Sequence, residues 1–415
     1  MKRKFRIIVG MLLLAIPLCV NAQVKPTKPE RPKPKTEKSE KPEKPEVKKP
    51  NAPMPGMKPD SPMKPDAPMP GMKPDGPKPG MDEPKGGITM PKISGFVQGM
   101  YQANLNDKGE LGDNTFRMRR VRLSVDGKLS KTVSYKIQGD FVNSPMLVDA
   151  FVKYKPCKEF AIQLGQFKTP FTIESPINPV NLEIFDYGES VQNLAGYSDV
   201  CGVGGLGRDI GIMASGDLFK LEDKDFALVN YSIGVFNGNG PVNFKKNEKG
   251  LDNNNRKDIV GRLEVHPGLK AITLSGSYYY GKYYKDEENY GTRNRWAAGA
   301  QYNDGKFVLR GEYIGGKTGY APTTIPEDLG YFNSNGYYAQ AGYYFQAGEQ
   351  KIMPVLRYEH FTADQAVTDG GTNWYTAGIN YWPLKSVNFK LDYSLIQKES
   401  GTNSHRVVGI LSYKF

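Results

Sequence analysis

The last ten residues of the chain, 406–415, alternate between two kinds of side chain with a period of two. One set is apolar or aromatic: Val407, Gly409, Leu411, Tyr413 and Phe415. The residues between them are more polar, beginning with Arg406 and ending with Lys414. Because successive side chains of a β-strand point to opposite faces, this pattern predicts a strand with one apolar face.

Runs of the same kind recur from about Ile88 onward, separated alternately by tight turns and longer connections. His266-Pro-Gly268 and Asn303-Asp-Gly305 are examples of the tight turns. Such alternation over about 16 candidate strands is typical of outer-membrane barrels, in which lipid-facing residues alternate with lumen-facing ones. The final Phe415 resembles the assembly signal of many such proteins. We therefore predict an all-β fold, a transmembrane antiparallel β-barrel of about 16 strands.

The composition is compatible with this fold. Only 38% of the 415 residues are hydrophobic. After the first 20 residues, no apolar run approaches the ~20 residues that a membrane helix needs. A spanning β-strand needs only ~9–11 residues, and only half of them must be apolar.

Two segments precede the predicted barrel. Residues 1–22 have a charged start, an apolar centre and the small-x-small sequence Val20-Asn21-Ala22, which together predict a signal peptide. Residues 23–87 are rich in Pro and Lys, and Ala52–Asp60 recurs as Ala67–Asp75. Proline at this density blocks helix and sheet, so we expect a disordered periplasmic arm. Residues 88–415 then form the barrel, with an inward third loop near 168–207.

The alternation also predicts which charges face the lumen. Val121, Leu123 and Val125 share one face, so Arg120 and Arg122 lie on the other. A charge on the lipid face would cost ~2–4 kcal/mol at mid-depth, which fixes this register. Applied along the chain, this reasoning gives a set of basic residues expected to line a pore and bind anions. They are Arg120, Arg122, Lys136, Lys153, Arg262, Arg310, Arg357, Lys390 and Arg406.

Guanidinium groups suit oxyanions because each planar fork donates two hydrogen bonds. Four of the basic residues, however, have an acid two positions later on the same face. The pairs are Arg262 with Glu264, Arg310 with Glu312, Arg357 with Glu359, and Lys390 with Asp392. Arg120 and Arg122 have no such neighbour before Asp126. The residues alone leave open an anion pathway, a general porin and a salt-bridged scaffold.

Signatures of other chemistry are weak. His266, His360 and His405 are scattered, and they form no metal or triad spacing. The run Gly202–Gly207 matches G-x-G-x-x-G but lacks the strand–turn–helix context that a dinucleotide site needs. Cys157 and Cys201 are expected near opposite ends of the barrel, without a disulfide. We predict no enzyme activity, no metal and no cofactor.

The formal net charge of +12 does not indicate a nucleic-acid partner. Most of the basic excess lies before residue 88, and the sequence contains no nucleic-acid-binding module or basic helix. The basic arm is better explained as a solvated segment.

The barrel region of the sequence resembles a known family, the phosphate-selective porins O and P of Gram-negative outer membranes. The resemblance covers nearly all of 93–415 and is strongest in three runs: Phe116-Arg-Met-Arg-Arg-Val-Arg-Leu123, Leu147-Val-Asp-Ala-Phe-Val-Lys-Tyr154 and Leu164-Gly-Gln-Phe-Lys-Thr-Pro-Phe171. It implies a sixteen-stranded barrel, usually trimeric, with arginines along an anion path and an inward third loop. It implies pore-lining roles for Arg120 and Arg122, with Lys168 and Arg208 flanking the loop.

These observations predict a porin of the cell outer membrane that passes small anions by passive diffusion, with phosphate or polyphosphate as candidate solutes. Its expected partners are outer-membrane lipid, small anions and two further copies in a homotrimer. The alternative is a barrel scaffold that recruits periplasmic proteins or peptidoglycan through residues 23–87.

Overall fold

The computed structural model describes residues 88–142, 146–220, 224–241, 256–284, 290–319 and 330–415. The predicted signal peptide and the arm therefore lie outside the described residues. Within those ranges no helix is long and apolar enough to cross a membrane.

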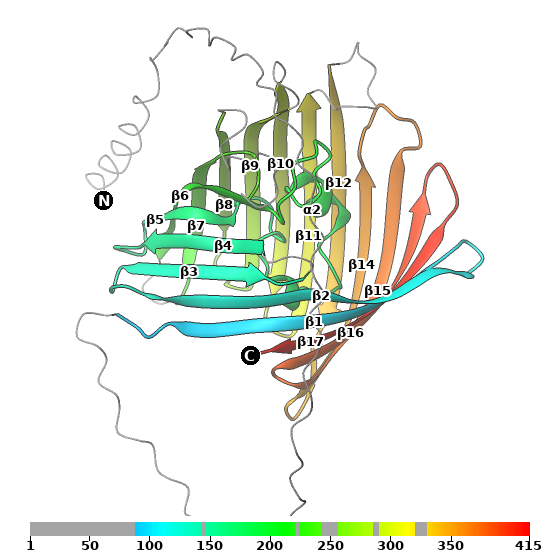
Figure 1. The fold of residues 1–415 in the computed structure, drawn as a ribbon, viewed down its shortest axis with the longest axis horizontal. Helices are drawn as coiled ribbons and strands as arrows, with labels where there is room; N and C mark the ends of the chain where they lie inside the picture. The colour runs from blue at the N-terminus through cyan, green and yellow to red at the C-terminus, as the bar shows by residue number, and fades with distance from the viewer. Residues whose placement is uncertain (1–87, 143–145, 221–223, 242–255, 285–289, 320–329) are drawn as a thin grey trace, which may run out of the picture. The chain divides into compact units, whose positions relative to one another are not determined.

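The described chain is almost entirely antiparallel strand (Figure 1). The strands are β1 (Lys92–Leu105), β2 (Leu111–Lys128), β3 (Val133–Asp140), β4 (Met146–Tyr154), β5 (Ala161–Lys168), β6 (Arg208–Lys220), β7 (Ala227–Phe236), β8 (Asp258–Val265), β9 (Ile272–Tyr284), β10 (Tyr290–Asn303), β11 (Phe307–Gly319), β12 (Tyr331–Tyr343), β13 (Phe345–Ala347), β14 (Gln350–Thr362), β15 (Gly371–Leu384), β16 (Val387–Lys398) and β17 (Ser404–Lys414). Two short helices, η1 (Pro179–Asn181) and α2 (Glu189–Leu194), lie between β5 and β6.

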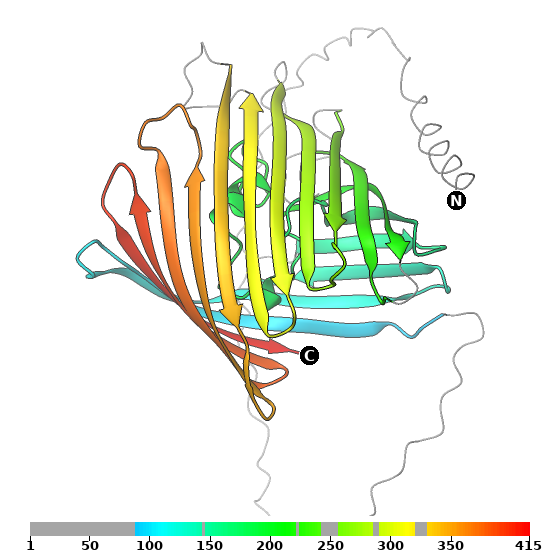
Figure 2. The same cartoon turned by 180° about the vertical axis from the view of Figure 1, so that it is seen from behind.

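Each strand pairs with its sequence neighbours, and the sheet closes on itself. β1 pairs with β2 on one side and with β17 on the other, as Figure 2 shows. β12 and β13 both pair with β14 and are separated only by Tyr344, so they form one interrupted strand. The described residues therefore build a closed barrel of sixteen strands, which confirms the predicted fold class.

The wall has an apolar outside and a polar inside. Along β16, Phe389, Leu391 and Tyr393 are exposed, whereas the alternating residues Lys390 and Asp392 are buried. The same arrangement holds at β2, where Leu123 is exposed and Arg122 is buried. An exposed apolar surface around a polar interior is the arrangement that a lipid environment requires.

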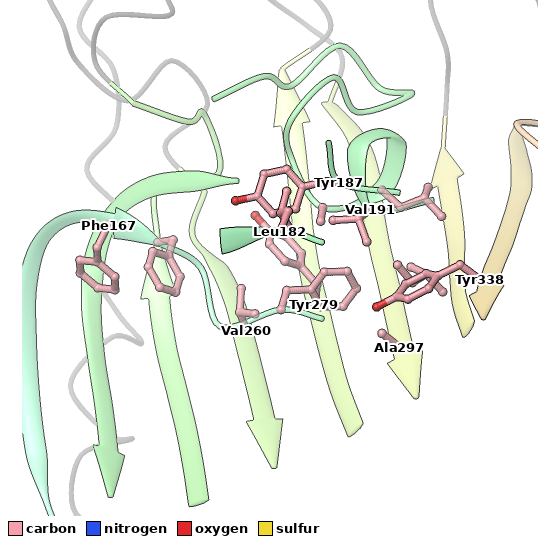
Figure 3. Close-up of a cluster of buried hydrophobic side chains, with 13 residues drawn as sticks. Phe167, Leu182, Tyr187, Val191, Val260, Tyr279, Ala297 and Tyr338 are labelled. Atoms are coloured by element: carbon pink, nitrogen blue, oxygen red, sulfur yellow. The ribbon is translucent and has the colours of Figure 1, made fainter. Parts of the chain in front are cut away.

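The interior also contains a hydrophobic cluster, shown in Figure 3, which the alternation did not predict. The segment between β5 and β6 contributes Leu182, Tyr187 and Val191 to it. Inward-facing residues of the wall form its other side: Phe236, Val260, Tyr279, Ala297, Ile314 and Tyr338. These apolar positions on β7–β12 give the segment a surface to pack against, so it lies inside the barrel rather than over its rim.

Candidate functional site

The segment 169–207, here called the inward loop, carries five acidic residues and no Lys or Arg. The acids are Glu174, Glu183, Asp186, Glu189 and Asp199. The basic residues near the inward loop therefore come from the barrel wall. The contacts between these two sets decide which wall cations remain available to a solute.

Glu174 and Glu183 bind two arginines of the wall. Arg357 donates to both carboxylate oxygens of Glu174, with Nη2 to Oε2 at 3.2 Å. Arg310 makes a two-pronged contact with Glu183, at 2.9 and 3.0 Å. The Glu174 side chain also accepts a hydrogen bond of 2.8 Å from the backbone N–H of Gly188. A Cβ at Gly188 would lie 1.9 Å from Arg357 Nη2, so only glycine leaves room for this guanidinium.

Asp199 binds a second pair of arginines, both on β10. Its carboxylate accepts from Arg293 Nε at 3.1 Å and from Arg295 Nη2 at 2.7 Å. All three side chains are almost completely buried. Burial alone would raise the pKa of Asp199, but the two guanidinium groups outweigh it and hold this pKa at about 2.

Asp186 binds a third pair, Arg119 and Arg120, which are adjacent in sequence. Two successive residues of a regular strand cannot face the same side. In β2 they do so because a β-bulge follows Gln98 of β1: Gln98 is opposite Arg120, and Gly99 is opposite Met118. Arg119 is the extra residue, and the bulge turns its side chain inward.

Two further cations hold the backbone of the inward loop. Lys390 donates to the carbonyl oxygens of Leu182 and Ile184. Arg262 donates to the carbonyl oxygen of Thr172 at 2.8 Å. These contacts occupy the two side chains with protein acceptors. Together with the contacts of the four loop carboxylates, they fix the inward loop to the β8–β16 side of the wall and to β2.

A different environment lies on the side of β2–β6. A pocket of about 220 Å³ opens there between the wall and the loop residues Pro176, Asn178 and Pro179. Its lining contains four basic side chains and one acidic one: Arg122, Lys136, Lys168, Arg208 and Asp149. We call this space the basic pocket.

The hydrogen bonds within the basic pocket leave part of its positive charge available. Arg122 uses Nε to bind Asp140 at 2.8 Å, and its two Nη atoms have no hydrogen-bond partner among the described residues. Arg208 binds Asp149 at 2.7 Å, and Lys136 Nζ lies 3.3 Å from the same carboxylate.

Lys168 contributes charge without a carboxylate partner. Its Nζ donates to the carbonyl oxygens of Ser175 and Ile177 and to the hydroxyl of Tyr187. These three acceptors use its three protons, so Lys168 has none left to donate to a solute.

The basic pocket continues toward the end of the barrel where the chain closes. A second space of about 270 Å³ shares Lys136, Gln138 and Asn178 with it and reaches Lys414 and Phe415. Lys414 donates to Asn181 of η1 at 2.6 Å. The two spaces adjoin along one side of the inward loop, and we call them together the polar passage.

The predicted basic residues thus separate into groups. Arg122, Lys136, Lys168 and Arg208 line the basic pocket. Five others hold the inward loop by hydrogen bonds or ion pairs: Arg120, Arg262, Arg310, Arg357 and Lys390. Lys153 is half-buried and lies outside the basic pocket. Arg406 binds Asn104 at 3.2 Å and stacks on Trp374 and Phe185.

Four pairs of opposite charges two residues apart were predicted, and the structure shows ion pairs at two of them. Arg262 does pair with Glu264 at 3.4 Å, and Arg357 with Glu359 at 2.7 Å. Arg310, however, pairs with loop acids rather than Glu312, which accepts from the backbone N–H of Ile173. Lys390 likewise binds loop carbonyls instead of Asp392.

Arg120 and Arg122, which seemed to lack an acid, each have one. Asp186 from the inward loop binds Arg120, and Asp140 from β3 binds Arg122. Neither acid can be found by spacing along β2, because each comes from another part of the fold.

Sequence reasoning missed Arg119, Arg293 and Arg295. Arg119 depends on the bulge, for which the sequence gives no signal. Arg293 and Arg295 do follow a period of two beside the outward Trp296, so the same alternation would have found them.

The other sequence features remain outside the site. Gly202–Gly207 lies in the inward loop and leads into β6, without a following helix. Cys157 is exposed and Cys201 is buried, and both are free thiols. No group of potential metal ligands is found among the described residues.

A closed barrel with an apolar outer wall, an inward loop and a polar passage defines the class of porin-like outer-membrane channels. A family model described as phosphate-selective porin O and P matches residues 92–409. The chain belongs to this family, which confirms the resemblance read from the sequence. As a member it is a porin, and it is located in the outer membrane.

Solved structures share the fold at low sequence identity. An anion-selective porin from Comamonas acidovorans matches with a TM-score of 0.57 and 14% identity, covering 79% of this chain and 99% of that one. The trimer form of OmpT from Vibrio cholerae matches with a TM-score of 0.54 and 11% identity, covering 79% and 100%. Salmonella typhi OmpF, in complex with daunomycin, gives 0.54 and 13%, covering 78% and 97%. No curated protein matches the chain.

Proposed function

We propose that this porin passes small anions by passive diffusion, with phosphate among them, through the polar passage beside β2–β6. The observation that carries the proposal is the basic pocket, whose lining has four cations against one acid. The free Nη atoms of Arg122 provide a two-pronged donor for an oxyanion. The family description and the anion-selective relative from Comamonas acidovorans point the same way.

The ion pairs of the inward loop support this route. Its acids bind Arg119, Arg120, Arg293, Arg295, Arg310 and Arg357. Those contacts neutralise the wall away from the basic pocket. An anion is therefore attracted mainly to one side of the lumen.

Conduction also requires that an anion leave each site readily. The basic pocket meets this requirement because Asp149 and Asp140 offset part of its charge, and because Lys168 has no proton left to donate. We infer moderate anion preference and weak, millimolar-range block by phosphate.

The test is the current through the protein in a planar bilayer, measured in a KCl gradient with and without phosphate. We expect the reversal potential to shift from zero toward the equilibrium potential of chloride. We also expect phosphate to reduce the chloride current reversibly. A cation preference would overturn the proposal, as would a channel that phosphate does not affect at any concentration tried.

We further propose that the porin is a homotrimer, because OmpT from Vibrio cholerae, which shares the fold, has a trimer form. Light scattering of the detergent-extracted protein tests this through its mass. A monomer mass at all protein concentrations would contradict it.

No observation on the described residues favours the scaffold alternative, which concerns the arm at residues 23–87.

A further inference from the structure

One edge of β2 is free over half its length, because β2 is longer than the strand beside it. β3 pairs with β2 only from Lys128 to Arg122, whereas β2 begins at Leu111. From Gly112 to Arg120 no strand of the described residues pairs with this edge, although β1 pairs with the other one. An unpaired edge presents a row of backbone N–H and C=O groups without partners.

The free edge carries apolar side chains on the outer face. Phe116 is 83% exposed and Met118 is 48% exposed. Such side chains belong in lipid or in contact with another protein rather than in water. Lipid tails, however, offer no hydrogen bonds, and open sheet edges do not occur in the hydrocarbon region. The free edge therefore calls for a protein partner.

The wall beside the free edge is also short for a membrane. β3 and β5 have 8 residues each, and β4 has 9. A spanning strand needs about 9–11 residues. The strands β9–β12, by comparison, have 13 or 14 residues. Protein rather than lipid alone is thus expected outside β3–β5.

Next to the free edge, the outer face of the barrel is hollowed. A space of about 610 Å³ is lined by residues of β1, β2, β16 and β17. Two outward glycines leave room for it: Gly99 is opposite Leu411, and Gly409 is opposite Tyr101. A Cβ at either glycine would meet nothing within 4 Å. We call this space the outer hollow.

We propose that the free edge of β2 and the outer hollow are the two patches through which copies of this chain contact each other. A closed ring of three copies needs a heterologous contact, in which one patch of each copy meets a different patch of the next. The outer hollow extends from β2 to β16, and the free edge is the far side of β2, so the patches are adjacent but distinct. This inference rests on the proposed homotrimer and names its contact surface.

The test is the mass of the full chain in mild detergent, measured by light scattering over a range of protein concentrations. Gly409→Leu fills the outer hollow without strain in a single barrel, because a Cβ there meets nothing within 4 Å. If a second copy occupies the outer hollow, the concentration at which the trimer dissociates should rise at least about tenfold. A trimer of wild-type stability in Gly409→Leu would mean that lipid tails fill the outer hollow, and it would overturn the proposal.

Gly276→Leu is the matched control. Gly276 of β9 is exposed on the outer face, and a Cβ there also meets nothing within 4 Å. This variant should keep the mass of the wild type at every concentration. Equal loss of the trimer in Gly276→Leu and Gly409→Leu would show that added bulk anywhere on the wall disturbs assembly, which would also overturn the proposal.

Phe116→Ala tests the free edge separately. It removes the most exposed ring of β2, and it should raise the dissociation concentration about tenfold. Leu356→Ala on β14 is its control, because Leu356 is 65% exposed on the outer face and far from both patches. Equal masses of these two variants at every concentration would overturn the role of the free edge.

Two measurements keep the outcomes distinct. Compact migration of the unheated protein on a gel shows that each variant has folded, and Gly409→Ala replaces Gly409→Leu should the larger residue prevent folding. A wild-type monomer would overturn the homotrimer itself. A wild-type trimer that Gly409→Leu and Phe116→Ala both leave intact would overturn only the contact surface.

Discussion

Arg357 of β14 and Glu174 of the inward loop are 183 residues apart, yet they form a hydrogen-bonded ion pair with both side chains completely buried. The pair lies where the inward loop packs against the wall, next to Arg310 and Glu183. A buried ion pair contributes little net stability compared with apolar residues, but removing one partner leaves an uncompensated charge. The position of the inward loop therefore depends on this pair remaining intact.

The first prediction concerns that dependence. Glu174→Gln should destabilise the barrel by about 3–5 kcal/mol, because it leaves the Arg357 charge buried and only partly matched. It should also raise the mean single-channel conductance and widen its distribution, because the inward loop is held less firmly. Urea unfolding in lipid vesicles and bilayer recordings measure the two effects.

Asp225→Asn is the matched control for Glu174→Gln. Asp225, between β6 and β7, pairs with Lys270, between β8 and β9, and both side chains are largely exposed. Such a surface pair contributes little to stability because solvent screens it, so both readouts should stay near wild type. Equal effects of the two substitutions would contradict the proposed role of Glu174.

The second prediction concerns the space beside Gly188. Gly188→Ala places a methyl group 1.9 Å from Arg357 Nη2 and should push the guanidinium away from Glu174. We expect a cost of about 1–3 kcal/mol and the same broadened conductance. Gly276→Ala is the control, since a Cβ there meets nothing within 4 Å. Wild-type conductance in Gly188→Ala would show that the inward loop tolerates displacement of Arg357.

The third prediction is a pH dependence. Burial, together with the nearby Glu359 carboxylate, raises the pKa of Glu189 in the inward loop from 4.5 to about 7. The neighbouring charges are Asp186, which adds to the effect, and Arg406, which opposes it. Lowering the pH from about 8 to about 5.5 should protonate Glu189, remove one negative charge from the lumen and increase anion preference.

The same shift has a consequence for stability. Because the folded-state pKa is the higher one, the folded protein binds this proton more tightly than the unfolded chain does, and the Glu189 contribution to stability falls as pH rises from about 4.5 through about 7. Glu189→Gln should give the low-pH anion preference at pH 8 and flatten the profile. A variant with the full wild-type pH response would refute this assignment.

The fourth prediction concerns barrel closure. Gly95 and Phe415 exchange backbone hydrogen bonds of 3.0 and 3.1 Å, and a Cβ at Gly95 would lie 2.5 Å from the Arg122 carbonyl oxygen and 2.6 Å from the Phe415 ring. Gly95→Ala should therefore weaken the contact between β1 and the chain end by about 1–3 kcal/mol. The unheated protein would then lose its compact form on a gel at a lower temperature. Gly99→Ala, which meets nothing within 4 Å, should behave as wild type.

The orientation of the wall followed from alternation alone, because a charge facing lipid is costly and a one-residue slip would reverse every side chain. Leu123 outside and Arg122 inside are the result. The alternation failed at Arg119, where one extra residue puts two adjacent arginines on the same face. A bulge leaves no mark in a run such as Arg117–Arg122.

The partners of the arginines could not be predicted, because they depend on where the inward loop packs. Spacing assigned Glu312 to Arg310, whereas the structure assigns Glu183, which is 127 residues away. The inward loop itself carries a usable signal in its five acids and absence of bases. Read together with the many inward arginines, that composition indicates a loop held by the wall rather than one that attracts anions.

The central claim is that anions cross beside β2–β6, where Arg122 has free donors, and not beside the arginines bound to the inward loop. Its most direct test is the reversal potential in a KCl gradient for the wild type, Arg122→Gln and the charge-neutral double variant Arg310→Gln/Glu183→Gln. We predict chloride preference in the wild type, a marked fall toward zero potential in Arg122→Gln, and a wild-type value in the double variant. A wild-type potential in Arg122→Gln, with a loss in the double variant, would contradict the account.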